Sequence, residues 1–163
     1  MLLPGQDSHF ALVRDLLERA VFTEATLCAR LGISSLQNFE EEFEAAEMPS
    51  STSDDVTGIL IRLFVEGHYV DGNLMERQFG VDETQAMLAL GLTKNSGNKV
   101  AASVALYPTA GVWIASDRWN SPDRTAYHTP ADVVYPAIVS NAQRFLKFMP
   151  QTKCDSLLDL CSG

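Results

Sequence analysis

The sequence predicts an α+β fold, and three observations along its 163 residues support this. Apolar residues recur at helical spacing up to about residue 91. The spacing then changes to alternation interrupted by tight turns, which is typical of short antiparallel strands. The last residues form an apolar run that ends in small residues. We therefore expect three regions, at residues 1–48, 54–117 and 118–163.

The first region, residues 1–48, is predicted to be a helical segment that caps the rest of the fold. One helix is expected over residues 7–20, with Asp7 or Ser8 as its cap and an apolar stripe facing the core. A shorter helix should begin at Thr23 and end at Gly32. A third is expected over residues 34–47. The apolar stripe of the first helix consists of Phe10, Val13, Leu16, Leu17 and Ala20.

The helix predicted over residues 34–47 is acidic. An acidic run of this kind is usually a solvated helix face, and a basic partner is the second interpretation. Residues 49–53 follow as a short connection. The acids of the run are Glu40, Glu41, Glu42, Glu44 and Glu47.

The second region, residues 54–117, combines three short helices with a small sheet. The helices are predicted from Asp54 or Asp55 to Gly67, from an Asp71 cap over 73–80, and from an Asp82 cap over 83–90. Three helices followed by a β-wing is the order of a winged-helix-like module. The expected strands cover residues 92–94, 99–107 and 112–115, with turns at 95–98 and 108–111.

Winged helices are best known for reading DNA with their third helix, and the charges here argue against that role. The expected third helix carries Asp82 and Glu83 and no basic residue. A helix that enters a DNA groove needs basic side chains for phosphate and for base edges. The formal net charge of -9 would also repel a phosphate backbone. We expect no direct DNA reading by this module.

Composition places the protein among cytoplasmic globular proteins. A hydrophobic content of 46% is ordinary for a chain that buries a core. Cys28, Cys154 and Cys161 show neither disulfide nor zinc spacing, which favours a reducing compartment. No apolar run is long enough for a membrane span and the N-terminus lacks a basic region, so we expect no membrane association.

The third region, residues 118–163, is expected to contain a loop, a helix and a strand. The helix should begin near Thr129 or Asp132 and continue to about Phe148. Residues 156–160 then read as a buried strand that enters a tight turn of small residues. Such a turn lets a backbone approach a nucleotide closely, as after the first strand of a Rossmann-like domain.

Asp159, Cys161 and Gly163 have the spacing of the opening motif D-x-[GC]-x-G-x-G of class I S-adenosylmethionine-dependent methyltransferases. The order of residues 54–163 resembles methyltransferases of the small-domain type, related to the release-factor glutamine and ribosomal RNA guanine methyltransferases. The resemblance implies S-adenosylmethionine as cofactor, with Asp159, Cys161 and Gly163 as its binding residues. It also places the stretch 129–132 near the cofactor or substrate.

The resemblance implies that this chain positions a macromolecular substrate, either a protein or ribosomal RNA, in a methyltransferase. The last glycine of the motif and the acid that binds ribose fall beyond Gly163 in the family pattern, so the chain alone is expected to be inactive and not to bind the cofactor. An unpaired terminal strand readily pairs with other strands, which predicts that it is either disordered or forms a homodimer by pairing with the same strand of a second copy. The alternative is a non-enzymatic, acidic winged-helix adaptor that binds another protein.

Few single residues outside this motif suggest chemistry. His9, His68 and His128 lack partners at metal or triad spacing, so surface or packing roles are expected. Trp113 is predicted to pack in the core, with an aromatic ligand wall as the lesser alternative. Arg118 is expected in an exposed cluster of mixed charge.

Overall fold

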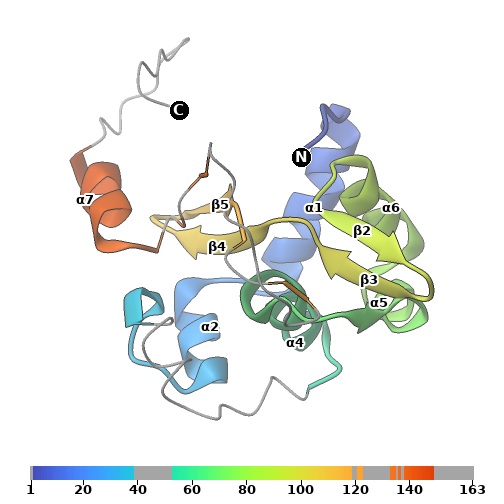
Figure 1. Ribbon diagram of the computed structural model, residues 1–163, viewed down its shortest axis with the longest axis horizontal. Helices are drawn as coiled ribbons and strands as arrows, with labels where there is room; N and C mark the ends of the chain where they lie inside the picture. The colour runs from blue at the N-terminus through green and yellow to red at the C-terminus, as the bar shows by residue number, and fades with distance from the viewer. Residues whose placement is uncertain are drawn as a thin grey trace.

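A computed structural model describes residues 2–38, 53–118, 121–122, 133–134, 136 and 138–148 (Figure 1). Within these ranges helices alternate with two small antiparallel sheets, one of three strands and one of two. The predicted α+β class is confirmed. The strand expected over residues 156–160 lies outside the described residues.

Helix α1, Asp7–Arg19, matches the first predicted helix, but its cap differs from the prediction. The N-cap is Gln6 rather than Asp7 or Ser8. The Gln6 amide donates to Nδ1 of His9 at 3.4 Å, and the His9 amide donates to the Gln6 carbonyl at 2.9 Å. This reciprocal pair satisfies two backbone groups of the first turn, so Asp7 is free to lie within the helix.

The end of α1 is a Schellman motif that places a valine where glycine is usual. The Phe22 amide donates to the Leu17 carbonyl and the Val21 amide to the Glu18 carbonyl, both at 2.9 Å. Val21 therefore adopts a positive φ of 48°. The motif turns the chain sharply and directs Phe22 into the core, where it is buried.

Helix α2, Glu24–Leu31, confirms the second predicted helix at both ends. The Thr23 hydroxyl accepts from the Thr26 amide at 3.3 Å, and Gly32 ends the helix at a φ of 70°. The 3-10 helix η1, Leu36–Asn38, follows. The rest of the predicted acidic helix lies outside the described residues.

One buried helical segment runs through the middle of the molecule and confirms the helix predicted up to Gly67. Helix α4, Val56–Leu60, continues directly into the π-helix η2, Ile61–Glu66, and Gly67 ends the segment at a φ of 76°. Most of its side chains are buried, as expected for a helix that other elements surround.

Asp55 is the N-cap of α4, as predicted, and its carboxylate is tied to two groups. Oδ1 accepts from the Gly58 amide at 2.7 Å, and Oδ2 lies 2.8 Å from Nη2 of Arg30 on α2. The Gly58 hydrogen bond, aided by Arg30, lowers the pKa of Asp55 below its usual value of 3.8. Only the ionised carboxylate is a full acceptor, so folding favours the charged form.

The lowered pKa of Asp55 predicts a stability change at acidic pH. The contribution should be present above the unfolded-state pKa near 3.8 and be lost as the pH falls through the lower folded-state value. Asp55→Asn keeps a good cap and should remove this pH dependence, whereas Asp55→Ala should cost about 1 kcal/mol at neutral pH. Urea denaturation of the three proteins at several pH values measures both effects. Equal stability of Asp55→Ala and the unchanged chain at neutral pH would contradict the assignment of the cap.

Two further helices follow the first strand of the first sheet in the sequence. Strand β1, Val70–Asp71, leads into α5, Gly72–Phe79, and the Asp71 carboxylate caps α5 by accepting from the Leu74 amide at 3.0 Å, as predicted. Helix α6, Val81–Ala89, begins earlier than predicted, and Asp82 is not its cap. Gly80 ends α5 and is the N-cap of α6: its carbonyl accepts the first hydrogen bond of the helix from the Thr84 amide at 3.2 Å, and a second from the Thr84 hydroxyl at 2.8 Å.

Strands β2, Thr93–Ser96, and β3, Lys99–Ala102, form a hairpin closed by Gly97 and Asn98. β1 pairs antiparallel with β3, with Val70 opposite Val100, so the strand order is β1-β3-β2. The order along the chain is therefore a helix, strand β1, two helices and the β2–β3 hairpin. The second strand of the hairpin, β3, pairs with β1. This is the topology of a winged-helix-like module.

The strand predicted over residues 99–107 is two strands. β3 ends at Ala102, and β4, Ala105–Thr109, instead pairs with β5, Val112–Ser116, in the second sheet. The chain bends at Ser103, whose amide donates to the Leu92 carbonyl at 2.8 Å. Alternating apolar residues continue through the bend, so the pattern alone could not locate it.

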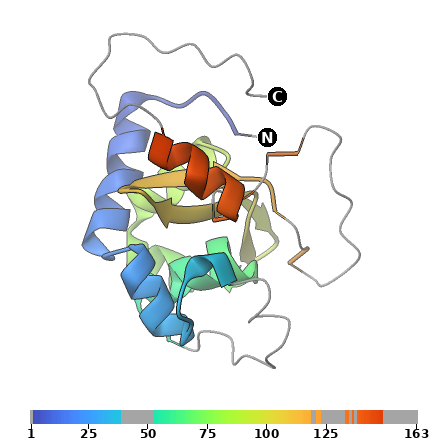
Figure 2. The ribbon, with the colours of Figure 1, turned by 90° about the vertical axis from the view of Figure 1, so that its left-hand side faces the viewer.

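Helix α7, Ser140–Phe148, begins later than predicted. Residues 133, 134 and 136 are not helical, and Pro136 gives the physical reason, because its ring disfavours a helical conformation in the preceding residue. Ile138, just before α7, is 3% exposed and belongs to the core. Figures 1 and 2 both place α7 beside the β4–β5 hairpin, at one edge of the molecule.

The two sheets and the helices share one hydrophobic core. Helix α1 packs along α6, and β4 packs on η2. The N-terminal segment is fastened to this body by the Leu3 amide, which donates to the Leu90 carbonyl at 3.0 Å. The largest buried side chains of the core are Tyr107, Phe22, Phe64, Leu16, Leu27, Leu36, Ile59, Leu60, Ile61, Leu63 and Met75.

Candidate binding groove

The three cofactor-binding residues expected from the sequence, Asp159, Cys161 and Gly163, lie outside the described residues, as does the stretch 129–132. The structure therefore brings none of them together with other groups. The expectations attached to them remain predictions. The described part of the chain has a different candidate site.

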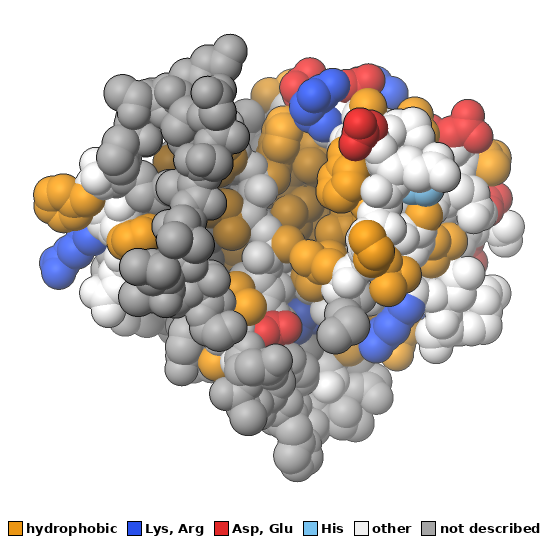
Figure 3. Space-filling view, turned by 90° about the horizontal axis from the view of Figure 1, so that it is seen from above, with side chains coloured by type: hydrophobic (Ala, Val, Ile, Leu, Met, Phe, Trp, Pro, Cys, Tyr) orange, Lys and Arg blue, Asp and Glu red, His pale blue; other side chains and the backbone are white. Residues whose placement is uncertain are grey.

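An apolar groove of about 650 Å³ lies between the N-terminal segment, one side of α1 and the β4–β5 hairpin. Figure 3 shows it as a hollow lined with hydrophobic side chains and bordered by charged ones. This volume is within the range of sites that bind small molecules or the side chains of a partner. Its lining consists of Leu2, Leu3, Asp7, Phe10, Ala11, Val13, Arg14, Leu17, Leu90, Leu92, Leu106, Trp113 and Ala115.

The walls of the groove come from three distant parts of the sequence. The Leu3–Leu90 hydrogen bond fixes the N-terminal wall beside the end of α6. The sequence predicted that Phe10 faces the core, but the structure corrects this: Phe10 is 55% exposed and lines the groove. An exposed phenylalanine beside further exposed leucines is typical of an interaction surface.

The charged border of the groove is formed by α1. Asp7 and Arg14 both line it. Nε of Arg14 lies 3.6 Å from Asp15 and 3.9 Å from Glu18, so neighbouring acids offset its charge. These groups are exposed, and pairs of this kind contribute little to stability. Helix α1 as a whole carries three acids and two arginines, so its net charge is slightly negative.

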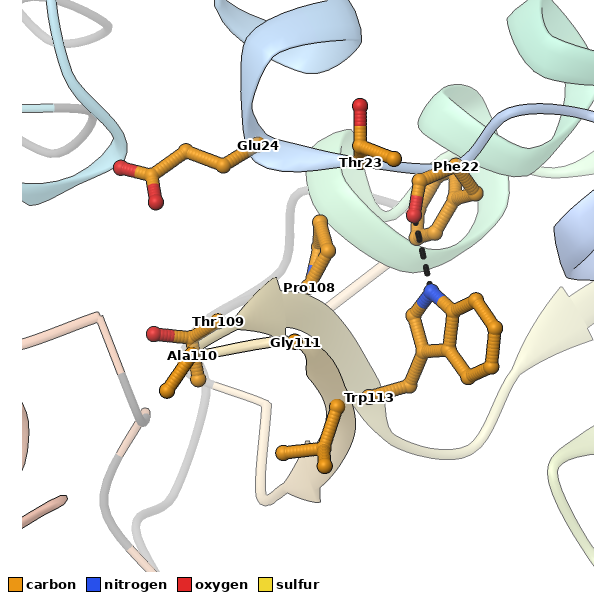
Figure 4. Close-up of a pocket in the computed structure, with 9 residues that line it drawn as sticks. Phe22, Thr23, Glu24, Pro108, Thr109, Ala110, Gly111 and Trp113 are labelled. Atoms are coloured by element: carbon orange, nitrogen blue, oxygen red, sulfur yellow. Dashed lines mark hydrogen bonds between the residues drawn. The ribbon is translucent and has the colours of Figure 1, made fainter.

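Trp113 connects the groove with a second, smaller cavity. Its indole Nε1 donates to the Phe22 carbonyl at 2.8 Å, which joins β5 to the turn between α1 and α2 (Figure 4). The ring is partly buried and also lines a cavity of about 170 Å³, as do Thr23, Glu24 and Pro108. The ring therefore packs against the core and forms an aromatic wall, the two roles considered for it from the sequence.

Helix α6, the counterpart of a DNA-reading helix, is covered along one side. It packs against α1. Nη2 of Arg19 donates to the Phe79 carbonyl at 3.1 Å and to Oε1 of Glu83 at 3.2 Å, which ties α1 to the start of α6. The acids Asp82 and Glu83 occupy its first turn.

Glu66, in the last turn of η2, is a buried acid. It is 2% exposed, and its Oε2 lies 3.4 Å from Nδ1 of His68. Arg118 was expected to be exposed, but it is 6% exposed, and its Nη1 donates to the Leu63 carbonyl of η2 at 3.0 Å. The Arg118 hydrogen bond anchors the chain after β5 to the central helix, which is a structural role.

The other two histidines are described only in part. The His9 side chain accepts a hydrogen bond from the amide of Gln6, the N-cap of α1, whereas His128 lies outside the described residues. Among the residues that the structure describes, no group of three or more histidines, cysteines or acids is placed to hold a metal ion. The same residues contain no helix that is long and apolar enough to cross a membrane.

Sequence reasoning missed the groove because its walls are assembled only by the fold. Phe10 was assigned to the core because it is seven residues from Leu17 and therefore on the same side of the first helix as a buried residue. No local pattern distinguishes the two positions.

Comparison with known proteins adds no relative. No protein-family model matches the sequence, and no curated protein matches it.

Proposed function

We propose that this chain belongs to a class I S-adenosylmethionine-dependent methyltransferase, in which it positions a protein or RNA substrate. The observation that carries the proposal is the motif Asp159-x-Cys161-x-Gly163 at the end of an apolar run. In this class the turn after the first strand holds the cofactor closely, and small residues allow that approach.

The described residues support a positioning role rather than a chemical one. They form a winged-helix-like module with an open apolar groove and hold no metal-binding cluster within the described ranges. Glu66 and His68, which are close to one another, lie on the central helix and its end and do not line the groove. Binding chemistry is therefore better represented in this part than acid–base chemistry.

Calorimetric titration with S-adenosylmethionine tests the proposal. The ligand is titrated into this chain and into a chain extended past Gly163 by the natural coding sequence. We expect binding by the longer chain alone, because the rest of the cradle is expected from residues after Gly163. In the longer chain, Asp159→Ala should abolish binding, and the matched control Asp155→Ala should leave it unchanged. Absence of binding by the extended chain would refute the cofactor assignment.

The second candidate function is an acidic adaptor that binds another protein. The observation that favours it is the groove, whose described lining is mostly apolar. A protein segment suits this lining better than a nucleic acid, because apolar walls and a net charge of -9 offer little to a phosphate backbone. If neither chain binds the cofactor, the adaptor becomes the better supported function.

A further inference from the structure

Helix α7 presents a pair of large apolar side chains to solvent. Phe145 and Phe148 are 64% and 86% exposed. They are three residues apart, so they lie on the same side of the helix, one turn from each other. Two exposed phenylalanines at this spacing form a compact apolar patch, and such patches mark contact sites.

The charge of α7 is opposite to that of the chain that carries it. The helix contains Arg144 and Lys147 and no acid, whereas the whole chain has a net charge of -9. Helix α1, which forms one wall of the groove, has Asp7, Asp15 and Glu18 against Arg14 and Arg19, so its net charge is also negative. A basic helix with an apolar face is therefore complementary to an apolar groove on an acidic chain.

The α7 of the same chain does not fill this groove. Ile138 is buried in the core two residues before α7 begins, and two residues span at most about 7 Å. The start of α7 is thus held near Ile138. Figure 1 shows α7 to the left of the β4–β5 hairpin, and the large exposed fractions of Phe145 and Phe148 agree with this position.

We propose that the groove binds α7 of a second copy of this chain. In the resulting dimer each copy inserts the Phe145–Phe148 face of α7 into the groove of the other, with Arg144 and Lys147 near the acids of α1. Such an exchange is isologous, so both grooves and both helices are used and the assembly closes at two copies. Helix α7 has nine residues and is about 14 Å long, which suits a groove bounded by one helix and one hairpin.

Sedimentation velocity over a range of protein concentrations tests the dimer. The unchanged chain should shift from monomer to dimer as the concentration rises. The double variant Phe145→Glu/Phe148→Glu on α7, and separately Phe10→Glu in the groove, should each weaken dimerisation by at least about 100-fold. Val81 on α6 is about as exposed as Phe10 and Phe145 but lies outside both surfaces, so Val81→Glu should have no effect on dimerisation.

A mixing experiment distinguishes the exchange from other dimers. The double α7 variant retains an intact groove, and the Phe10→Glu variant retains an intact α7. An equimolar mixture should therefore form a heterodimer through one restored contact, although each variant alone is monomeric. In a chain without other substitutions, reversing the charge of α7 with Arg144→Glu/Lys147→Glu should weaken dimerisation by about 10-fold at low salt.

Two results would overturn the proposal. One is a chain that stays monomeric at every concentration. The other is a dimer that survives both the α7 and the Phe10 variants, as a dimer through residues 156–161 would. Far-ultraviolet circular dichroism shows that each variant is folded. No cofactor enters these measurements, so their outcome is independent of the methyltransferase assignment.

Discussion

Phe22→Ala is expected to lower the free energy of unfolding by about 3–5 kcal/mol, the usual cost of deleting a buried phenylalanine ring. The side chain is completely buried, and its backbone amide and carbonyl hold Leu17 and Trp113 in place. Removing the ring leaves a cavity where α1, α2 and β5 meet. Equilibrium denaturation in urea, followed by the fluorescence of the two tryptophans, measures the loss.

Val21, the residue before Phe22, provides a control substitution that should not lower the free energy of unfolding. Val21 is exposed and has a φ of 48°, a conformation that is unfavourable for a β-branched residue and that costs about 1–2 kcal/mol. Val21→Gly removes this strain and should leave stability equal or raise it by about 1 kcal/mol.

A loss below about 1 kcal/mol for Phe22→Ala would show that the ring does not support the core as described.

The sequence predicted the helices well where short-range chemistry determines them. Thr23, Asp55 and Asp71 each cap the helix expected of them, since a side chain only has to reach an amide two or three residues away. Gly32 and Gly67 stop helices by adopting a positive φ that other residues avoid. These interactions are local, so they can be read without knowledge of the fold.

One failed prediction has a local cause: Asp82 is as good a cap as Asp71, but Gly80 already provides the turn that starts α6. Two others depended on contacts between residues farther apart in the sequence. The bend at Ser103 follows from the hydrogen bond to Leu92, and nothing near Ser103 in the sequence signals it. Arg118 is buried because the Leu63 carbonyl is available to it, which only the packing of the central helix determines.

The same distinction applies to the candidate sites. The predicted cofactor motif is local and lies outside the described residues, so it stays a prediction. The groove consists of side chains from both ends of α1 and from β4 and β5, and no short pattern contains them together. A sequence pattern can therefore suggest a compact binding loop, whereas a surface assembled from several elements becomes visible only in the structure.

Gly80→Ala is expected to cost about 1–3 kcal/mol from backbone strain alone. Gly80 has a φ of 109° and a ψ of 156°, a region that is essentially restricted to glycine. An added Cβ would also collide with the carboxylate of Glu83 and displace it from Arg19, which ties α1 to α6. The variant should therefore lose stability and loosen the wall of the groove that α1 forms.

Gly32→Ala is the matched control for this effect. Gly32 also has a positive φ, 70°, but no atom lies within 4 Å of the position of an added Cβ. Its cost should be only the left-handed backbone penalty of about 1–2 kcal/mol. Urea denaturation should then rank Gly80→Ala as clearly less stable than Gly32→Ala. Equal losses would mean that Glu83 moves aside freely, and hydrogen exchange at the start of α6 would then show no increase in the Gly80 variant.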